Sequence, residues 1–374
     1  MRQAPPIPGR RIWPFLVPLG ALAGLGILWT GLWFYAAGKA DAAITGWRER
    51  ESRVGRSYAC ESQTVGGFPV QIKVSCTQPT IELSRETPPL ALHGGDLLVF
   101  AQVFDPTRLA AYLAGPLTIG ESGQAPRYRA NWRSAEVSAR GTPRAPEQIS
   151  FEIENTTVDR LAGGEAKIAF SAQRLELDGR IIEGSAARDP VIGMTLHLGA
   201  AAAPELHPLT AEPIDADLSA VLRGLADFAP KPWAVRLKEL QAHGGTIEIT
   251  KARAQQGDAI AVGTGTLALT ARGTLDGQLE VTVAGIERIL KALDLDRIMA
   301  EGRIGASLNS LDNIIPGLGR LARRNAAPGI VAGLGMIGQK ATLEGKSAVT
   351  LPLRFADGAV SLGPIPVGRV PPLF

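Results

Sequence analysis

The sequence has few of the side chains on which enzyme chemistry and base stacking depend. Aromatic residues make up 5% of its 374 residues, and it holds four histidines and two cysteines. The histidines lack the spacing of a helical metal site, and the Gly-x-Ser-x-Gly elbow of many hydrolases does not occur. They are His93, His197, His207 and His243. We therefore predict no catalytic residue, no cofactor, no metal site and no enzyme.

The sequence also lacks an excess of charge of one sign. Lysine and arginine number 39 against 36 acidic residues, and the surplus is Arg2, Arg10 and Arg11 near the N-terminus. This balance excludes the basic footprint of a nucleic-acid-binding protein. With 43 glycines and 27 prolines, the composition favours turns over long helices, while 45% apolar residues are enough for a core. The counts exclude a helical bundle and a disordered chain.

Charged residues are absent altogether from residues 12–37. A helix needs about 20 apolar residues to cross the hydrocarbon core of a bilayer. We predict a cytoplasmic tail at 1–11 and an uncleaved transmembrane anchor at 12–37. The alternative is a cleaved signal peptide, whose apolar region has roughly 7 to 15 residues. Because Arg10 and Arg11 directly precede the helix, we expect the bulk of the chain outside, which in a bacterium makes a single-pass inner-membrane protein facing the periplasm.

The residues after the anchor have a helical apolar spacing. Ala40, Ile44, Trp47 and Val54 recur at intervals of four, three and seven residues, which predicts a helical stalk at 38–57. The charged residues of this stalk form either a solvated helix face or a contact with lipid headgroups.

Two cysteines flank a predicted hairpin. Cys60 precedes Gly66-Gly67-Phe68-Pro69, and apolar residues then alternate with polar ones up to Cys76. Closely spaced cysteines of this kind predict a disulfide in an oxidising compartment, with two reduced buried thiols as the alternative. A bridge closing this loop stabilises by roughly 3 kcal/mol in the chain-entropy model.

Most of the remaining chain predicts strands. Gly94-Gly95, Gly163-Gly164 and Gly244-Gly245 each precede a segment of alternating apolar and polar residues. The fold class we predict is mainly β (α+β), in which residues 58–374 form an extended or curved antiparallel sheet with a few packed helices. The expected helices are Trp233–His243, Ile286–Ile298 and part of Pro328–Ala341.

A strand-then-helix echo at an offset of 180 residues predicts two similar halves, at 58–200 and 201–374. In the first copy, Asp105 as N-cap and Pro106 at the first helical position predict a helix that ends before Gly115. The strand before it, Leu97–Phe104, is apolar on both faces except at Gln102. It is either a core strand under that helix or the lining of an apolar groove, with the candidate residues Leu97, Val99, Phe100 and Val103.

Motifs at both ends of the chain carry a family resemblance. They are Gly66-Gly67-Phe68-Pro69 with Ile72, Val74 and Cys76, Leu353-Arg354-Phe355-Ala356-Asp357-Gly358, Leu362-Gly363-Pro364-Ile365-Pro366 and Pro371-Pro372-Leu373. With them, essentially the whole chain after the anchor resembles the alphaproteobacterial family of domain of unknown function 2125. The resemblance implies a membrane-anchored envelope protein of unassigned activity. The architecture is also similar to that of AsmA-like proteins, whose curved sheets are thought to hold lipid chains, and this likeness is one of analogy.

These observations favour a binding protein over a catalyst. The first expectation is a membrane-anchored periplasmic protein that binds or transfers a lipid or another envelope component through an apolar sheet face. The alternative is a structural or assembly partner of another envelope protein, docked through a sheet edge or through residues 364–374. An envelope hydrolase is the third expectation. The predicted partners are the inner membrane and a lipid ligand or an envelope protein, and not nucleic acid.

Overall fold

A computed structural model describes residues 13–142, 145–163, 165–206, 208–229, 231–285, 338–362 and 365–374. Its first element is the helix α1, Trp13–Arg53, which runs without a break through the predicted anchor and most of the predicted stalk. The helix ends at Arg53, before the predicted end at residue 57, because the strand β1 (Arg56–Ala59) begins at Arg56. By length and composition α1 is able to cross a membrane, as either an anchor or a signal sequence. The stalk is therefore a direct continuation of the apolar segment, and its direction is fixed by that segment.

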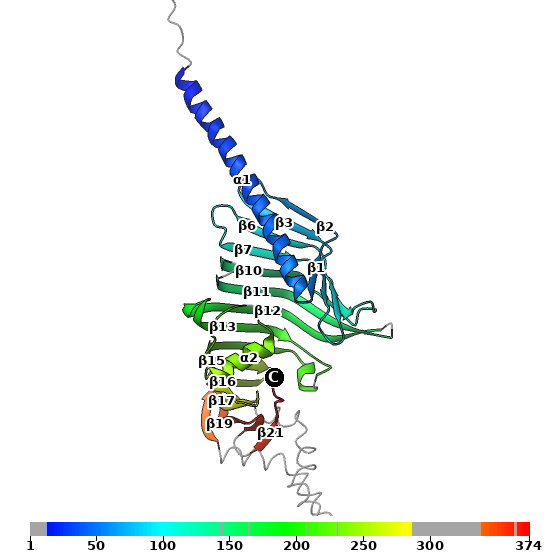
Figure 1. Cartoon of the computed structure of the whole chain (residues 1–374). Coiled ribbons are helices and arrows are strands. Elements are labelled where there is room, and N and C mark those ends of the chain that lie inside the picture. Colours follow the sequence, from blue (N-terminus) through cyan, green and yellow to red (C-terminus); the bar gives the residue numbers. More distant parts are fainter. Residues whose placement is uncertain are drawn as a thin grey trace, which may run out of the picture.

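The rest of the described chain is dominated by antiparallel strands that follow one another in a long sheet (Figure 1). Its main branch has the order β2-β3-β6-β7-β10-β11-β12-β13-β14-β15-β16-β17-β19. These strands are β2 (Ser62–Gly66), β3 (Gln71–Thr77), β6 (Leu97–Gln102), β7 (Arg108–Leu113), β10 (Ser134–Thr142), β11 (Ala145–Ala162), β12 (Glu165–Ser185), β13 (Arg188–Ala201), β14 (Ile214–Arg223), β15 (Thr246–Gln256), β16 (Ala259–Leu269), β17 (Leu275–Ala284) and β19 (Lys346–Ala356).

The far side of β19 is shared by two strands. Its first half pairs with β18 (Gln339–Leu343) and its second half with β20 (Ala359–Leu362), which in turn pairs with β21 (Ile365–Arg369). Asp357 and Gly358, both at positive φ, make the tight turn predicted between β19 and β20.

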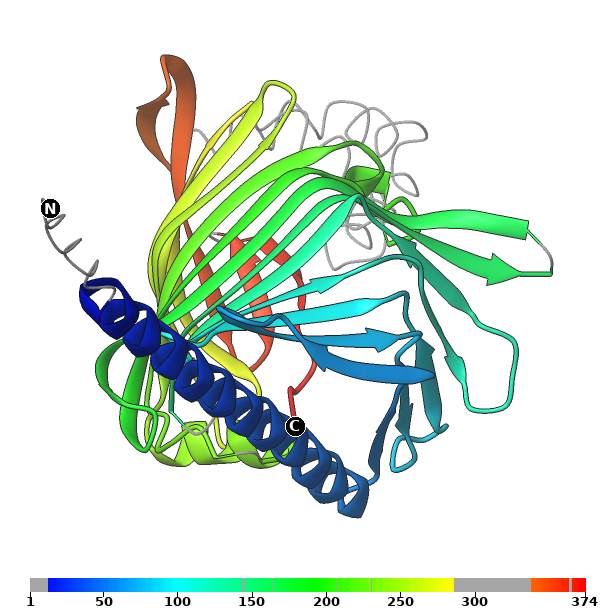
Figure 2. The same cartoon turned by 90° about the horizontal axis from the view of Figure 1, so that it is seen from above.

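A second branch leaves the sheet at the long strand β11. Residues 145–154 of β11 pair with β10, whereas residues 157–160 pair with β9. The second branch has the order β9-β8-β5-β4-β1. Its strands are β1 (Arg56–Ala59), β4 (Thr80–Leu83), β5 (Leu90–His93), β8 (Leu117–Glu121) and β9 (Tyr128–Asn131). Figure 2 shows the two branches diverging and the main branch curving around an interior. The mainly β fold with a curved antiparallel sheet is thus confirmed.

Short helices punctuate the sheet. The predicted helix at Trp233–His243 is confirmed as α2 (Trp233–Ala242), and a 3-10 turn, η1, covers Pro208–Ala211. The helix predicted after Asp105 is wrong, because Arg108–Leu113 form β7 between β6 and β10. The helix predicted at Ile286–Ile298 lies outside the described residues, as does most of the one at Pro328–Ala341, whose last residues belong to β18.

The predicted disulfide is confirmed and links the two branches. Cys60, just after β1, bonds to Cys76 on β3, with 5.4 Å between their Cα atoms. The guanidinium of Arg48 on α1 donates a hydrogen bond to the sulfur of Cys60, at 3.0 Å. The helix α1, the main branch and the second branch therefore meet at the disulfide.

Candidate functional site

Alternation along each strand divides the main branch into two faces, and the pairing register tells which residues share a face. Two adjacent residues on β3, Val74 and Lys73, each begin a row of direct cross-strand partners. The row that starts at Val74 contains only apolar residues and glycine, whereas the row that starts at Lys73 is predominantly polar.

The apolar row extends from one end of the main branch to the other. Each member is the direct cross-strand partner of the next. It consists of Val65, Val74, Val99, Ala111, Val137, Phe151, Leu177, Leu196, Leu218, Ala252, Gly263, Val281 and Leu351. At about 4.8 Å between strands, these twelve steps make a path of about 58 Å. That is nearly four times the roughly 15 Å of hydrocarbon in one leaflet of a bilayer.

The polar row is offset by one residue from the apolar row on each strand and points to the opposite side. Its members from β3 to β15 are Lys73, Phe100, Ala110, Ser138, Ser150, Asp178, Thr195, Ser219 and Lys251. Some are joined by hydrogen bonds: the Ser150 hydroxyl and the Gln148 amide both donate to the Asp178 carboxylate. Residues on this side are therefore solvated and bonded among themselves.

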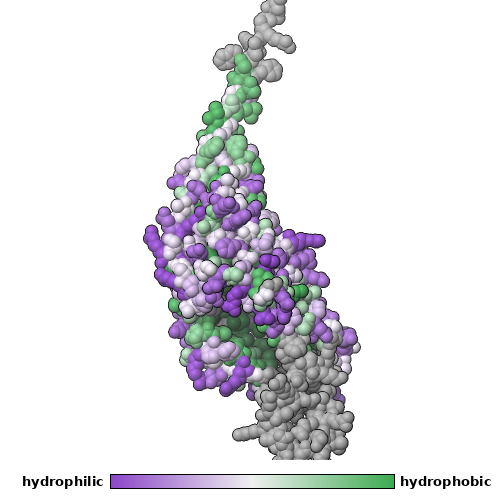
Figure 3. Space-filling model, turned by 90° about the vertical axis from the view of Figure 1, so that its right-hand side faces the viewer, coloured by the Kyte–Doolittle hydropathy of each residue, from purple (hydrophilic) through white to green (hydrophobic). Residues whose placement is uncertain are grey.

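Large side chains on the apolar face stay partly open in the middle of the sheet. Ile149 on β11 is 48% exposed and Leu177 on β12 is 46% exposed. Isolated exposed apolar residues are ordinary, but a contiguous set marks a binding surface. Figure 3 shows a hollow with hydrophobic walls between polar rims on the side turned to the viewer. The apolar face of the main branch is the candidate functional site.

The predicted groove residues fall on both faces. Leu97 and Val99 lie on the apolar face, where Leu97 is the partner of Cys76 and Val99 is the partner of Val74. Phe100 lies on the polar side, with its ring against Tyr112 at 5.8 Å and against the ammonium of Lys73. Val103 follows the end of β6, and its N–H donates to the carbonyl of Val70. Two of the four candidates therefore belong to one surface.

Two polar features lie on the opposite face. His197 Nδ1 and Asp217 Oδ1 are 2.8 Å apart in a pocket of about 380 Å³. A catalytic triad also needs a hydroxyl or thiol bonded to the imidazole, and within the described part of the chain none is. The described residues also contain no group of three or more metal-ligating side chains. The two side chains thus form a solvent-exposed hydrogen bond on the polar face.

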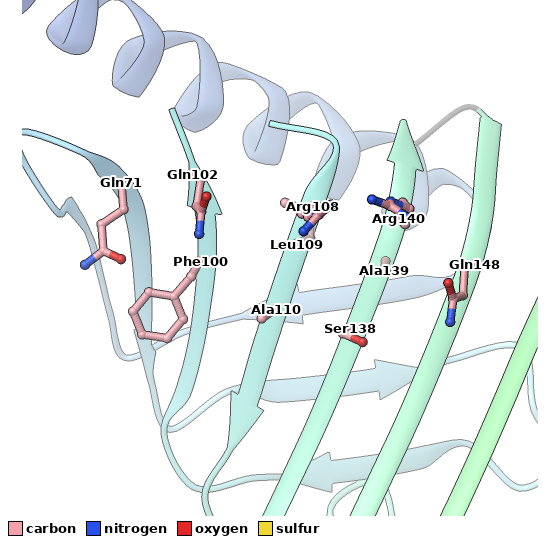
Figure 4. A pocket seen from close by; sticks show the side chains of 10 residues that line it. All are labelled: Gln71, Phe100, Gln102, Arg108, Leu109, Ala110, Ser138, Ala139, Arg140 and Gln148. Carbon is pink, nitrogen blue, oxygen red and sulfur yellow. The ribbon is translucent and has the colours of Figure 1, made fainter. Parts of the chain in front are cut away.

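A second pocket of about 420 Å³ lies at the strand ends of the polar face (Figure 4). It is lined by Gln71, Phe100, Gln102, Arg108, Leu109, Ala110, Ser138, Ala139, Arg140 and Gln148, a set with two cations and no acid. Beside it, the Thr107 hydroxyl holds the pKa of Asp105 below its ordinary value, with help from Arg108. Burial and the carboxylate of Glu136 raise the pKa of Tyr112. This end of the polar face therefore presents arginine side chains to solvent.

Helix α1 docks on the sheet through two tryptophans. The indole N–H of Trp29 donates to the carbonyl of Pro69 at 2.8 Å, and that of Trp33 donates to the carbonyl of Gln71 at 3.0 Å. The spacing of four residues between the two tryptophans, with Ala37 and Ala40 continuing the same helix face, is the signal of a docking stripe.

Fold and surface together define the class: a protein with one N-terminal apolar helix and an open antiparallel sheet that is apolar on one face and polar on the other. The particular family follows from comparison with known proteins. Residues 33–371 match the family of uncharacterized proteins conserved in bacteria known as DUF2125, and the chain belongs to it. No curated protein matches the sequence. The similarity to AsmA-like proteins stays a prediction.

Proposed function

We propose that this protein is a membrane-anchored periplasmic protein that holds the hydrocarbon of a lipid or a similar envelope component against the apolar face of its sheet. The observation that carries the proposal is the unbroken apolar row from Val65 to Leu351. The opposite face of the same sheet has no continuous apolar row, so such a row is not a requirement for forming the sheet. The disulfide between Cys60 and Cys76 supports the oxidising compartment.

Hydrocarbon is the occupant that the chemistry of this face favours. The row offers no charge and no hydrogen-bonding side chain, so it recognises an apolar chain by contact area alone. Each buried methylene group contributes about 0.8 kcal/mol, and ten of them about 8 kcal/mol, which corresponds to micromolar affinity before the cost of ordering the chain. A face about 58 Å long has room for one or more acyl chains laid across the strands.

The test is photocrosslinking in cells fed a fatty acid that carries a diazirine and an alkyne. The full-length protein is purified and its bound lipid label is measured. We expect Leu177→Arg to lose most of the label, because Leu177 lies in the centre of the apolar row and is half exposed. A half-exposed position also tolerates arginine better than a buried one does.

The matched control is Thr195→Arg. Thr195 is exposed on the neighbouring strand β13, and it is the partner of Asp178 on the polar side. The two variants introduce the same side chain within one strand of each other but on opposite faces. Equal labelling of both variants would refute the proposal. Crosslinks to one protein in place of lipid, lost in Leu177→Arg alone, would favour the assembly-partner alternative.

A further inference from the structure

We infer that the end of the sheet beside α1 enters the membrane interface, where Phe68, Val70 and Phe104 insert at the boundary between headgroups and hydrocarbon. The partner is the leaflet from which α1 emerges. The inference rests on the proposed membrane anchoring and deepens it, because it states where the apolar face meets the lipid.

The tips of two turns are fixed at one height on α1. The β2–β3 turn is held by the hydrogen bonds from Trp29 to Pro69 and from Trp33 to Gln71. Trp33 is 4% exposed, and its ring meets the ring of Phe68 edge-on at 5.6 Å. The β6–β7 turn is held by Phe104, which stacks on Trp29 at 5.1 Å. Neither turn is able to move along the helix without breaking these contacts.

The length of the helix then sets the depth of the turns. Starting at Trp13, a rise of about 1.5 Å per residue puts Trp29 about 24 Å and Trp33 about 30 Å along the axis. A hydrocarbon core of about 30 Å therefore ends near Trp33. If the bilayer instead ended below Trp29, residues 13–28 would have to span it with about 24 Å, which is too short by about one turn. The docked turns thus lie at the boundary.

The exposed side chains of the turns fit this depth. Phe104 is 72% exposed and Phe68 is 51% exposed, and Val70 beside them is equally open. Aromatic residues concentrate at the interface of membrane proteins, where the ring is buried and the polar backbone remains hydrated. Gly67 allows the tight β2–β3 tip, since at its φ of 101° a Cβ would lie 2.6 Å from the carbonyl of Gln71.

Two arginines lie directly behind these apolar tips, and one of them, Arg108, forms an ion pair with Asp105 at 2.9 Å. Gln71 and Gln102 adjoin the two turns and line the same polar-face pocket as Arg108 and Arg140 (Figure 4). Apolar tips backed by arginine side chains are the pattern of a surface that binds an anionic bilayer. We therefore expect Arg108 and Arg140 to lie at the level of the lipid phosphates.

The depth of the two turns determines where the apolar row meets the membrane. Val65 and Val74, its first members, lie on β2 and β3, the strands that the inserted tip connects. The apolar face therefore begins at the leaflet surface, and hydrocarbon from that leaflet reaches it without crossing water.

The test measures the depth of the tips in vesicles. Single cysteines replace Phe104, Val70 or, as the control, Leu206, an exposed leucine between β13 and β14. The native cysteines form a disulfide, so the environment-sensitive dye NBD labels the new position. The labelled full-length proteins are reconstituted in vesicles of phosphatidylethanolamine and phosphatidylglycerol that contain a lipid with a doxyl quencher near its headgroup.

We expect the labels at 104 and 70 to lose most of their emission to the quencher and the label at 206 to keep it. Equal emission at all three positions in protein that floats with the vesicles would overturn the inference, and the crosslinking test of the apolar face would stand independently of that result. Protein that does not float would overturn both proposals, since neither survives without the anchor. Quenching at the tips together with failed lipid crosslinking would support the inference alone.

Discussion

The docking of α1 on the sheet is the contact whose loss has the most specific consequence. Trp33→Ala removes a side chain that is almost fully buried. A tryptophan buries about 150–250 Å², and at about 25 cal/mol per Å² this contributes about 4–6 kcal/mol. Large aromatic to alanine changes in protein cores cost about 3–5 kcal/mol, which agrees. We expect the docked state to lose at least 3 kcal/mol, which shifts the docking equilibrium by about 100-fold or more.

Hydrogen–deuterium exchange of the full-length protein in lipid nanodiscs measures this shift. Trp33 is hydrogen-bonded to the carbonyl of Gln71 at the start of β3, so we expect exchange of the β2 and β3 amides in Trp33→Ala to rise by about 100-fold when local opening governs it. Strands β13 and β14 lie far along the sheet and keep their protection. Trp33→Phe retains most of the ring but loses the hydrogen bond to Gln71, so about 1 kcal/mol and a roughly fivefold rise are expected.

The control for this experiment is Tyr35→Ala on the same helix. Tyr35 is 63% exposed, and the ammonium of Lys39 lies 5.4 Å from the centre of its ring. The variant Tyr35→Ala loses an aromatic side chain of α1 but, among the described residues, no hydrogen bond or ring contact with the sheet. If Tyr35→Ala accelerates exchange in β2–β3 as much as Trp33→Ala does, Trp33 does not fix the helix on the sheet, and the two turns are not held at a set depth in the membrane.

Two further predictions concern the disulfide and the charged residues around α2. Replacing Cys60 and Cys76 by serine is expected to lower the free energy of unfolding by about 3 kcal/mol, measured in denaturant, and reducing agent should then have no further effect. Hydrogen bonds from Lys231, then from the Ala229 N–H and Arg236, lower the pKa of Asp227. Because the pKa of Asp227 is lower in the folded state than in the unfolded chain, the ionised carboxylate stabilises the fold when the pH is above the unfolded-state pKa. This stabilisation is lost as the pH falls below about 4. Asp227→Asn should therefore show a smaller loss of melting temperature in acid than the parent protein.

Local sequence signals predicted the elements better than they predicted the faces. Alternation identified most strands, and paired glycines marked the starts of β6, β12 and β15. Face continuity, however, depends on irregularities that alternation hides. Along β15 the apolar face passes from Ile247 and Ile249 to Ala252 and Ala254, because the register shifts between Ile249 and Ala252. A strict period of two would have put these pairs on opposite faces.

The segment after Asp105 shows how pairing overrides a local signal. Asp105 and Pro106 do form a turn, in which the N–H of Arg108 donates to the carbonyl of Asp105 at 3.1 Å. The residues that follow have ordinary helix propensity, yet they gain hydrogen bonds from β6 on one side and β10 on the other. Strand β10 is distant from β7 in the sequence, so a short sequence window around β7 does not contain the pairing that decides its structure.

The exposure of the apolar face falls toward the far end of the sheet, and this distinguishes a surface that transfers lipid from one that holds it. In the middle of the sheet, Ile149 and Leu177 are about half exposed, whereas toward the far end Leu267, Val283 and Leu351 are buried. A passage for lipid needs an open surface at both ends, because the chain must leave as well as enter. A face that is open in the middle and closed at the far end retains what it receives. The gradient therefore favours a holding site, loaded from the end next to α1, over a continuous channel.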